Sequence, residues 1–284
     1  MRHLRLDEKI DVSINSRVSL RIYADSRPHV LQIAKLQKGV ILVCDGKELV
    51  EEGLGLGVPV CRYKDGTHFS LSADTFVDDS RSAPSIIKIY DMDGIASKRF
   101  RGVPIRRGRY LAGLLKVLEK VYRAIRRFRV NATLTLDLLS LLGMTNEYLA
   151  SRSKGRIVVT YFPSGRSLQI NADLEGLSQE GLQSVVFANE ESGRLFSKYT
   201  DSTGIKLHGG EIEPWRTTLA EWASLHAPEF DLGFSLRRPS GWLIVRGREV
   251  VRGRISWSGV DLLYKGMPQA LEYRVQIIEG SVVD

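Results

Sequence analysis

The sequence of 284 residues contains only two cysteines, Cys44 and Cys61. They form no CxxC pair and have no histidine pair nearby, which excludes a zinc site of the usual ligand spacing. We expect buried free thiols on adjacent strands, because disulfides are uncommon inside cells. A disulfide between the two, or a reactive thiol, is the alternative.

The five histidines also show no metal-ligand spacing (His3, His29, His68, His208 and His226). The sequence has no GxSxG elbow, no Walker A loop and no dinucleotide-binding glycine pattern. We therefore predict no metal and no cofactor, and no catalytic residue is assigned from a motif.

Long apolar runs are missing as well. The most apolar stretch, 134–144, contains Asp137 and is shorter than the roughly 20 residues that span a bilayer. The first residues, MRHLRLDEK, lack the apolar centre of a secretory signal. We expect a soluble, cytoplasmic protein with no membrane span.

What the chain does contain is short runs rich in Val, Ile, Leu, Tyr and Phe, separated by Gly, Asp, Asn or Pro. Asp65-Gly66 and the segment 163–166 have turn residues and predict hairpins. Because these runs do not alternate regularly with helices, a doubly wound α/β fold is disfavoured. The runs that we predict as strands are 10–22, 39–44, 58–63, 68–73, 86–90, 130–138, 156–162, 167–172, 194–199, 230–236, 242–245, 250–257 and 271–278.

The predicted fold class is mainly β, a large antiparallel two-sheet sandwich with one long amphipathic basic helix packed on it. We predict residues 1–284 as one large β-rich domain. The alternative is a β domain at 1–97, a helical connector at 98–129 and a second β domain at 130–284.

The basic charge is concentrated in residues 98–129, which hold twelve basic side chains and one acidic one, Glu119. This segment carries a net charge of +11, whereas the whole chain carries +8. Between 109 and 128 apolar residues recur at three- and four-residue steps, as on one face of an amphipathic helix (Leu111, Leu114, Leu115, Leu118, Val121, Tyr122, Ile125 and Phe128). Arg and Lys occupy the opposite face.

The nearly unmixed charge of this helix predicts an anion-binding surface, since ordinary solvated helices intersperse Glu with Lys. Arginines at the predicted helix start add to this, because backbone N–H groups there also attract anions. The partner is a polyanion (nucleic acid or an anionic saccharide) or an acidic protein. A solvated surface helix is the alternative. The predicted anion-binding residues are Arg106, Arg107, Arg109, Lys116, Lys120, Arg123, Arg126 and Arg127.

A second cationic stripe is predicted at 246–254, where arginines of the same parity share one face of an extended strand (Arg246, Arg248, Arg252 and Arg254). We expect this to be the polar outer face of a half-buried strand. Together with Arg237 and Arg238 it forms the alternative, a second anion-binding patch.

Acidic residues and tryptophans give a different function, a carbohydrate-active enzyme (hydrolase, lyase or epimerase) on a β-sandwich. Sugar chemistry uses paired carboxylates, and indole rings stack on sugars. The acids gather as Asp74, Asp78 and Asp79, as Glu190 and Glu191, and as Glu211 and Glu213; the tryptophans are Trp215, Trp222, Trp242 and Trp257. Solvated loop acids and core tryptophans are the alternative. A third function is a structural protein that docks an acidic partner.

Asp91-Met92-Asp93-Gly94 follows the apolar run 86–90. This local pattern resembles the first motif of haloacid-dehalogenase-type phosphatases, and the resemblance implies Asp91 as nucleophile and Asp93 as acid. The pattern departs at Ile95, where that family has Thr or Val, and no later acidic motif follows. We therefore interpret the segment as a turn.

Overall fold

The structure is a computed structural model that describes residues 1–25, 36–51, 53–80, 84–100, 103–104, 144–251 and 255–280. In these residues all regular elements are β-strands or short 3-10 turns, and every strand pair is antiparallel. The prediction of a mainly β protein is confirmed. The predicted basic helix and the predicted strand 130–138 lie outside the described residues.

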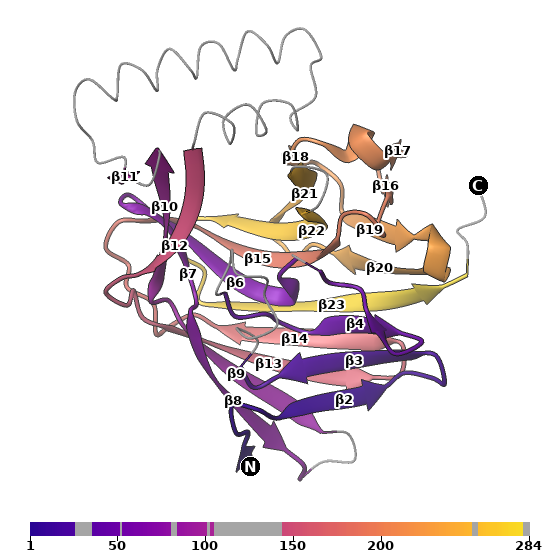
Figure 1. Ribbon diagram of the computed structural model, residues 1–284, viewed down its shortest axis with the longest axis horizontal. Coiled ribbons are helices and arrows are strands. Elements are labelled where there is room, and N and C mark those ends of the chain that lie inside the picture. The colour runs from indigo at the N-terminus through magenta and orange to yellow at the C-terminus, as the bar shows by residue number, and fades with distance from the viewer. Residues whose placement is uncertain are drawn as a thin grey trace, which may run out of the picture.

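The strands form three sheets rather than the predicted two (Figure 1). The first has ten strands in the order β1 (Arg2–His3), β8 (Ser72–Asp78), β9 (Ser85–Asp91), β13 (Arg156–Ser164), β14 (Ser167–Asp173), β23 (Ala270–Glu279), β20 (Leu232–Arg237), β19 (Trp222–Ala227), β16 (Lys198–Asp201) and β17 (Lys206–His208).

The second sheet has nine strands and the third has four. The nine-stranded sheet runs β11 (Val103–Pro104), β10 (Gly94–Phe100), β7 (Gly66–Phe69), β6 (Gly55–Tyr63), β15 (Leu182–Ser192), β22 (Ile255–Lys265), β21 (Leu243–Val251) and β18 (Arg216–Thr218), with β12 (Met144–Ala150) also paired to β10. The four-stranded sheet runs β2 (Lys9–Ser13), β3 (Val18–Tyr23), β4 (Ile41–Cys44) and β5 (Lys47–Glu48). The 3-10 turns are η2 (Gly209–Ile212) and η3 (Pro228–Phe230).

Strands that have one buried face show strict alternation of buried and exposed side chains. In β23 the residues Leu271, Tyr273, Val275 and Ile277 are buried, whereas the residues between them are exposed. This is the period of two that one buried sheet face demands. By contrast β6 is buried along most of its length, so residues of both its faces are covered.

One hydrophobic cluster takes in residues of all three sheets. Phe187 of the nine-stranded sheet meets Tyr273 of the ten-stranded sheet, with 6.4 Å between ring centroids. Leu20 and Leu42 bring the four-stranded sheet into the same cluster. The two large sheets and the small third sheet thus share one core, and the third sheet is an addition to the prediction.

Several predicted turns are confirmed. Asp65-Gly66 joins β6 to β7, and the segment 163–166 joins β13 to β14 with Ser164 opposite Ser167. The segment with the phosphatase-like pattern is the connection from β9 to β10, where Asp93 accepts hydrogen bonds from the Leu71 N–H (2.8 Å) and the Ser72 hydroxyl (2.7 Å).

Both cysteines are buried and free, as predicted. Cys44 lies in the four-stranded sheet and Cys61 in the nine-stranded sheet, so the expectation of adjacent strands is wrong. Burial raises the pKa of Cys61 to about 12, which keeps its thiol unreactive at neutral pH.

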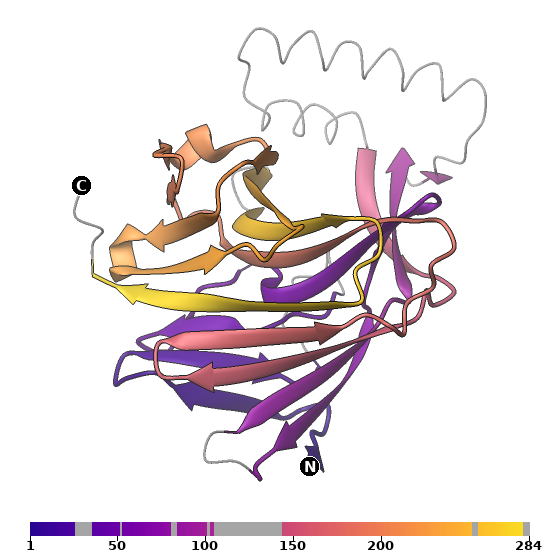
Figure 2. The same ribbon diagram turned by 180° about the vertical axis from the view of Figure 1, so that it is seen from behind.

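The nine-stranded sheet turns strongly along its width. In both views β10 and β12 stand across the direction of β15 and β22 (Figures 1 and 2). This curvature lets a side chain of β12 approach the face of β15 and β21, as described below.

Candidate active site

Carboxylic acids gather on one face of the nine-stranded sheet, the face that is turned away from the core. Glu190 of β15 lies opposite Gly259 of β22, which lies opposite Gly247 of β21. Asp261 and Glu249 follow these glycines by two residues, so alternation places all three carboxyls on the same face. We call Glu190, Glu249 and Asp261 the carboxyl cluster.

The floor of this cluster is an indole ring laid over the two glycines. A Cβ on Gly247 would lie 2.2 Å from Trp215 Cδ2, and a Cβ on Gly259 would lie 3.0 Å from Trp215 Cη2. The same Gly259 position would lie 2.9 Å from Glu190 Cγ. Only glycine leaves room for the ring here, and Trp215 and Glu190 meet above Gly259.

A β-bulge positions Asp261. Gly57 of β6 is the extra residue between Ala188 and Asn189 of β15, and its φ is +79°. Next to the bulge, the Asn189 N–H donates to Asp261 Oδ1 of β22 at 2.9 Å. Bulges commonly redirect groups beside functional sites.

The Asn189 side chain anchors the bulge from the core side. Its Oδ1 accepts from the Gly57 N–H (3.1 Å) and the Tyr273 hydroxyl (2.9 Å). Its Nδ2 donates to the Phe187 and Val260 carbonyls at 3.1 and 3.2 Å. Every hydrogen-bonding atom of the amide is used, which holds the backbone beneath the carboxyl cluster in place.

The pKa values of the cluster are all raised. For Glu190, burial raises the pKa well above its usual value, and the Asp261 charge adds to this. The Leu54 N–H opposes the shift by donating to Glu190 Oε2 at 3.4 Å. Burial also raises the pKa of Asp261, and the Asn189 N–H opposes it. Burial and the Asp261 charge therefore favour the protonated form of Glu190, whereas the Asn189 N–H favours the anion of Asp261.

The pKa of Glu249 lies near neutral pH. Burial, followed by the charge of Glu213, raises the pKa of Glu249 to about 7. Such a group accepts and returns protons at neutral pH. The charges of Glu190 and Glu249 also contribute to raising the pKa of Tyr148 to about 12, after burial, so the Tyr148 phenol of β12 lies close to both acids.

The Tyr148 ring is itself held edge-on by Phe69, with 5.1 Å between centroids. The arrangement thus places a proton donor, a proton acceptor and a phenol around a half-buried indole. Such a set is able to bind a flat apolar face and move protons at the groups beside it.

The predicted acids separate into different roles. Glu190 belongs to the carboxyl cluster, whereas Glu191 points into the core, where burial raises its pKa well above the usual value. Glu211 lies in η2 and Glu213 directly follows this turn, so the two acids do not share a strand face. Sequence reasoning missed Glu249, Asp261 and Tyr148.

The tryptophans separate in the same way. Trp242 is core, Trp222 is 40% exposed on β19, and Trp257 lies opposite Glu249 beside the cluster. Trp215 alone is laid over the glycine pair. Trp215 and Trp257 are therefore the two tryptophans that remain candidates for stacking on a sugar.

The second cationic stripe is not an outer face. Arg246 is buried, donates to the Ile212 carbonyl at 2.8 Å and lies 5.4 Å from the centroid of Tyr199. Arg248 donates to the Gly193 carbonyl at 2.7 Å and pairs with Glu213 at 3.3 Å. The expectation of a polar outer face is wrong for these two, because their long side chains supply hydrogen bonds to otherwise unpaired carbonyls. Arg252 and Arg254 lie outside the described residues.

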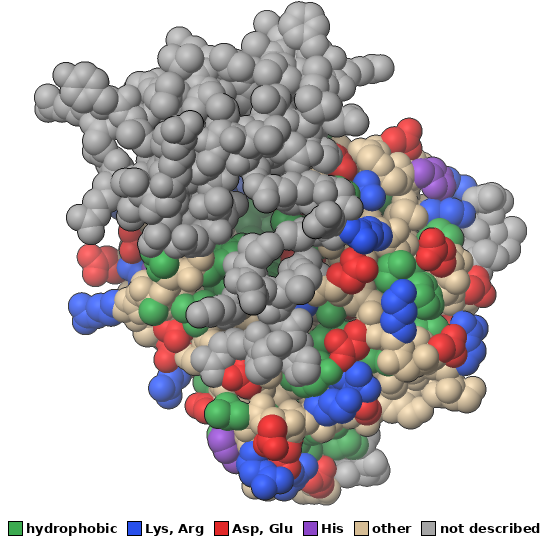
Figure 3. Space-filling model, in the orientation of Figure 1, with side chains coloured by type: hydrophobic (Ala, Val, Ile, Leu, Met, Phe, Trp, Pro, Cys, Tyr) green, Lys and Arg blue, Asp and Glu red, His purple; other side chains and the backbone are tan. Residues whose placement is uncertain are grey.

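The eight predicted anion-binding residues, from Arg106 to Arg127, also lie outside the described residues. On the face shown in Figure 3, acidic and basic side chains of the described part are intermixed. Three histidine, cysteine or acidic side chains able to hold a metal do not come together in the described ranges. No helix of those ranges is long and apolar enough to cross a membrane.

No protein-family model and no curated protein matches this chain. Among solved structures, a protein of Synechocystis sp. PCC 6803 is similar over 98% of both chains, with a TM-score of 0.42 and 11% identity. A galactose mutarotase-like protein from Lactobacillus casei is similar over 95% of this chain and 99% of its own, with a TM-score of 0.43 and 10% identity. At these values neither neighbour assigns an activity to this chain.

Proposed function

We propose that this protein is a carbohydrate-active enzyme that moves protons at the anomeric centre of a sugar. The observation that carries the proposal is the carboxyl cluster, in which Glu190 and Glu249, both with raised pKa values but with different charged neighbours, lie beside the indole of Trp215. Pairs of acids whose environments push their pKa values apart are typical of acid–base catalysis.

In this proposal Glu190 is the general acid and Glu249 the general base. The base takes the proton of the anomeric hydroxyl while the acid protonates the ring oxygen, so that the bond from the anomeric carbon to the ring oxygen breaks. Reversal of these transfers on either face of the aldehyde closes the ring. Asp261 is a positioning residue, because its charge adds to burial in favouring the protonated form of Glu190.

The substrate class follows from the floor of the site. An indole presents a flat apolar face of the kind that stacks on the C–H groups of a pyranose. Ring opening is favoured over hydrolysis, because both carboxyls rise from one sheet face and approach the sugar from the same side. Glycosidases place their two carboxyls on either side of the scissile bond.

The test is the rate of interconversion of α- and β-anomers of common aldoses, followed by polarimetry. We expect Glu190→Gln to lower kcat by at least about 100-fold, as general acid–base contributions usually do. Glu180→Gln, an exposed acid outside the cluster, is the control and should retain the rate.

Trp215→Ala should chiefly raise KM, since it removes the stacking face. Wild-type protein that accelerates no aldose, or a Glu190→Gln variant as fast as wild type, would contradict the proposal. Release of nitrophenol from aryl glycosides by wild type but not by Glu190→Gln would replace ring opening with hydrolysis.

A further inference from the structure

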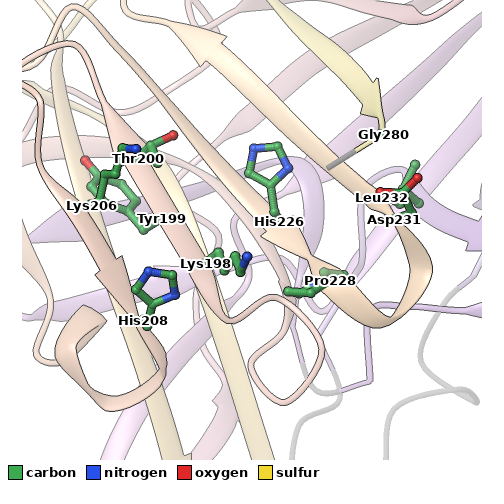
Figure 4. Close-up of a pocket in the computed structure, with 11 residues that line it drawn as sticks. Lys198, Tyr199, Thr200, Lys206, His208, His226, Pro228, Asp231, Leu232 and Gly280 are labelled. Carbon is green, nitrogen blue, oxygen red and sulfur yellow. The ribbon is translucent and has the colours of Figure 1, made fainter. Parts of the chain in front are cut away.

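A second polar site lies on the ten-stranded sheet, on the face turned away from the core. It is a cavity of about 90 Å³ lined by lysine and histidine side chains and also by apolar residues, among them Pro228 and Leu232 (Figure 4). The lining residues that matter below are Lys198, Thr200, Lys206, His208, His226 and Asp231.

Strand register explains why these side chains converge. Lys198 of β16 lies directly opposite His208 of β17 on one side and His226 of β19 on the other. Side chains directly opposite each other in antiparallel strands point to the same face and are in reach of one another. One cation is therefore flanked by two imidazoles, and Lys206 lies opposite Thr200 in the next row.

The more buried imidazole is held in a fixed position. His226 Nε2 lies 3.3 Å from the Ser224 hydroxyl, which is hydrogen-bonded to the Thr200 hydroxyl at 2.6 Å. A Cβ on Gly233 would lie 2.3 Å from His226 Nδ1, so the ring rests on this glycine. His226 is only 6% exposed.

The charges of the cavity are not neutralised within the described part of the chain. Neither Lys198 nor Lys206 makes an ion pair or a hydrogen bond with its ammonium group among the described residues. Asp231 lines the far side of the cavity without pairing to Lys198 (Figure 4). Two lysines and two histidines thus line the cavity together with the Asp231 carboxylate, and the Glu211 carboxylate accepts from the His208 backbone N–H at 3.0 Å.

We infer that this cavity binds the phosphate group of a small phosphate monoester. Ammonium and imidazolium N–H donors form short charge-assisted hydrogen bonds with phosphate oxygens. A divalent cation is disfavoured, because the Lys198 ammonium occupies the position between the two imidazoles. The cavity volume admits one such group together with a few water molecules. The Asp231 carboxylate is placed to accept a hydrogen bond from a hydroxyl group elsewhere on the ligand.

The experiment is titration of the full-length protein with inorganic phosphate at constant ionic strength, followed by the NMR signals of the five histidines. We expect the signals of His208 and His226 to shift and the pKa of His226, which burial and Lys198 lower in the free protein, to rise. Lys198→Met should weaken phosphate binding by about tenfold or more.

Lys9→Met removes the same charge from an exposed site on β2 and is the matched control. Phosphate that leaves both imidazole signals unchanged, or that binds Lys198→Met as tightly as wild type, would overturn the inference. Vesicles of phosphatidic acid are tested in parallel. Retention of the protein on them without any shift from inorganic phosphate would overturn the small-molecule ligand in favour of a lipid headgroup. Neither result depends on sugar turnover at the carboxyl cluster, because Glu190 takes no part in this site.

Discussion

The raised pKa of Glu249, a member of the carboxyl cluster, makes the stability of the fold depend on pH. Glu249 has a pKa of about 7 in the folded chain and 4.5 as its ordinary value. The stability that this raised pKa contributes is fully present below pH 4.5 and is lost as the pH rises toward 7, because the unfolded chain releases the proton first. In the proposed function this loss of stability accompanies a proton acceptor that works at neutral pH.

Glu249→Gln should therefore stabilise the protein at neutral pH. We expect the free energy of unfolding at pH 8 to exceed that of wild type by about 2 kcal/mol, and the difference to disappear near pH 4. Urea unfolding at the two pH values measures this, with Glu180→Gln as the exposed control. A constant difference at both pH values would show that the pKa of Glu249 is not raised.

At the scale of the element, the pairing of β6 with β15 decides where the acids point. The bulge at Gly57 lies next to Asn189, whose side chain binds the Gly57 N–H and whose backbone N–H donates to Asp261. A Cβ on Gly57 would lie 2.9 Å from both Ile170 Cδ1 and Tyr161 Cε1, and the φ of +79° is unfavourable for other residues. The bulge therefore requires glycine for two separate reasons.

A comparison of Gly57→Ala with Gly46→Ala distinguishes the effect of the positive φ from the effect of the crowded Cβ position. Gly46 has the same φ of +79°, but a Cβ there meets nothing within 4 Å. We expect Gly46→Ala to cost about 1 kcal/mol of unfolding free energy from the backbone alone, and Gly57→Ala to cost about 1–3 kcal/mol more from overpacking. Equal losses in thermal or urea unfolding would show that the sheet accommodates the methyl group.

The strands with strict alternation, such as β14 and β23, were predictable from the sequence, because one face is core and the other is solvent. The central strand β15 was missed. Its Asn189, Glu190 and Glu191 look like a polar loop, since acids are seldom buried. Nothing local reveals that Asn189 has partners 132 and 84 residues away, and pairing of Glu190 with Gly259 is likewise a property of register.

The site was predictable only in part for the same reason. Glu190 and Trp215 were recognisable as residue types suited to sugars, but their meeting over Gly259 depends on three strands and a connection. His208 and His226 were judged by spacing along the chain, which gave no ligand pattern. Their approach on either side of Lys198 follows from pairing in β16, β17 and β19.

At the scale of the whole molecule, a buried lysine joins two sheets. Lys88 of β9 donates to the Tyr23 carbonyl of β3 at 3.1 Å and to the Lys38 carbonyl at 2.8 Å. It is completely buried, and burial lowers its pKa from 10.5 to about 7. The stability that the lowered pKa of Lys88 contributes is fully present above pH 10.5. It is lost as the pH falls toward 7, because the unfolded chain binds the proton first.

Lys88→Met should flatten the pH dependence of stability. Between pH 7.5 and 9.5 we expect the unfolding free energy of wild type to rise by about 1.4 kcal/mol per pH unit more than that of the variant. Urea unfolding across this range measures the difference of slopes, which does not depend on the packing that the methionine changes. Parallel slopes would mean that Lys88 stays charged in the fold.

The buried acids have a consequence for calorimetry. The formal charge of +8 counts every carboxyl as ionised, yet burial raises the pKa of Glu190 and Glu191 well above the usual value and that of Glu249 to about 7. These carboxyls therefore take up protons from the solution when the chain folds at neutral pH, and release them when it unfolds. Each released proton is absorbed by the buffer, so the heat of unfolding recorded in Tris differs from that recorded in phosphate by the difference in the ionisation heats of the two buffers, multiplied by the number of protons.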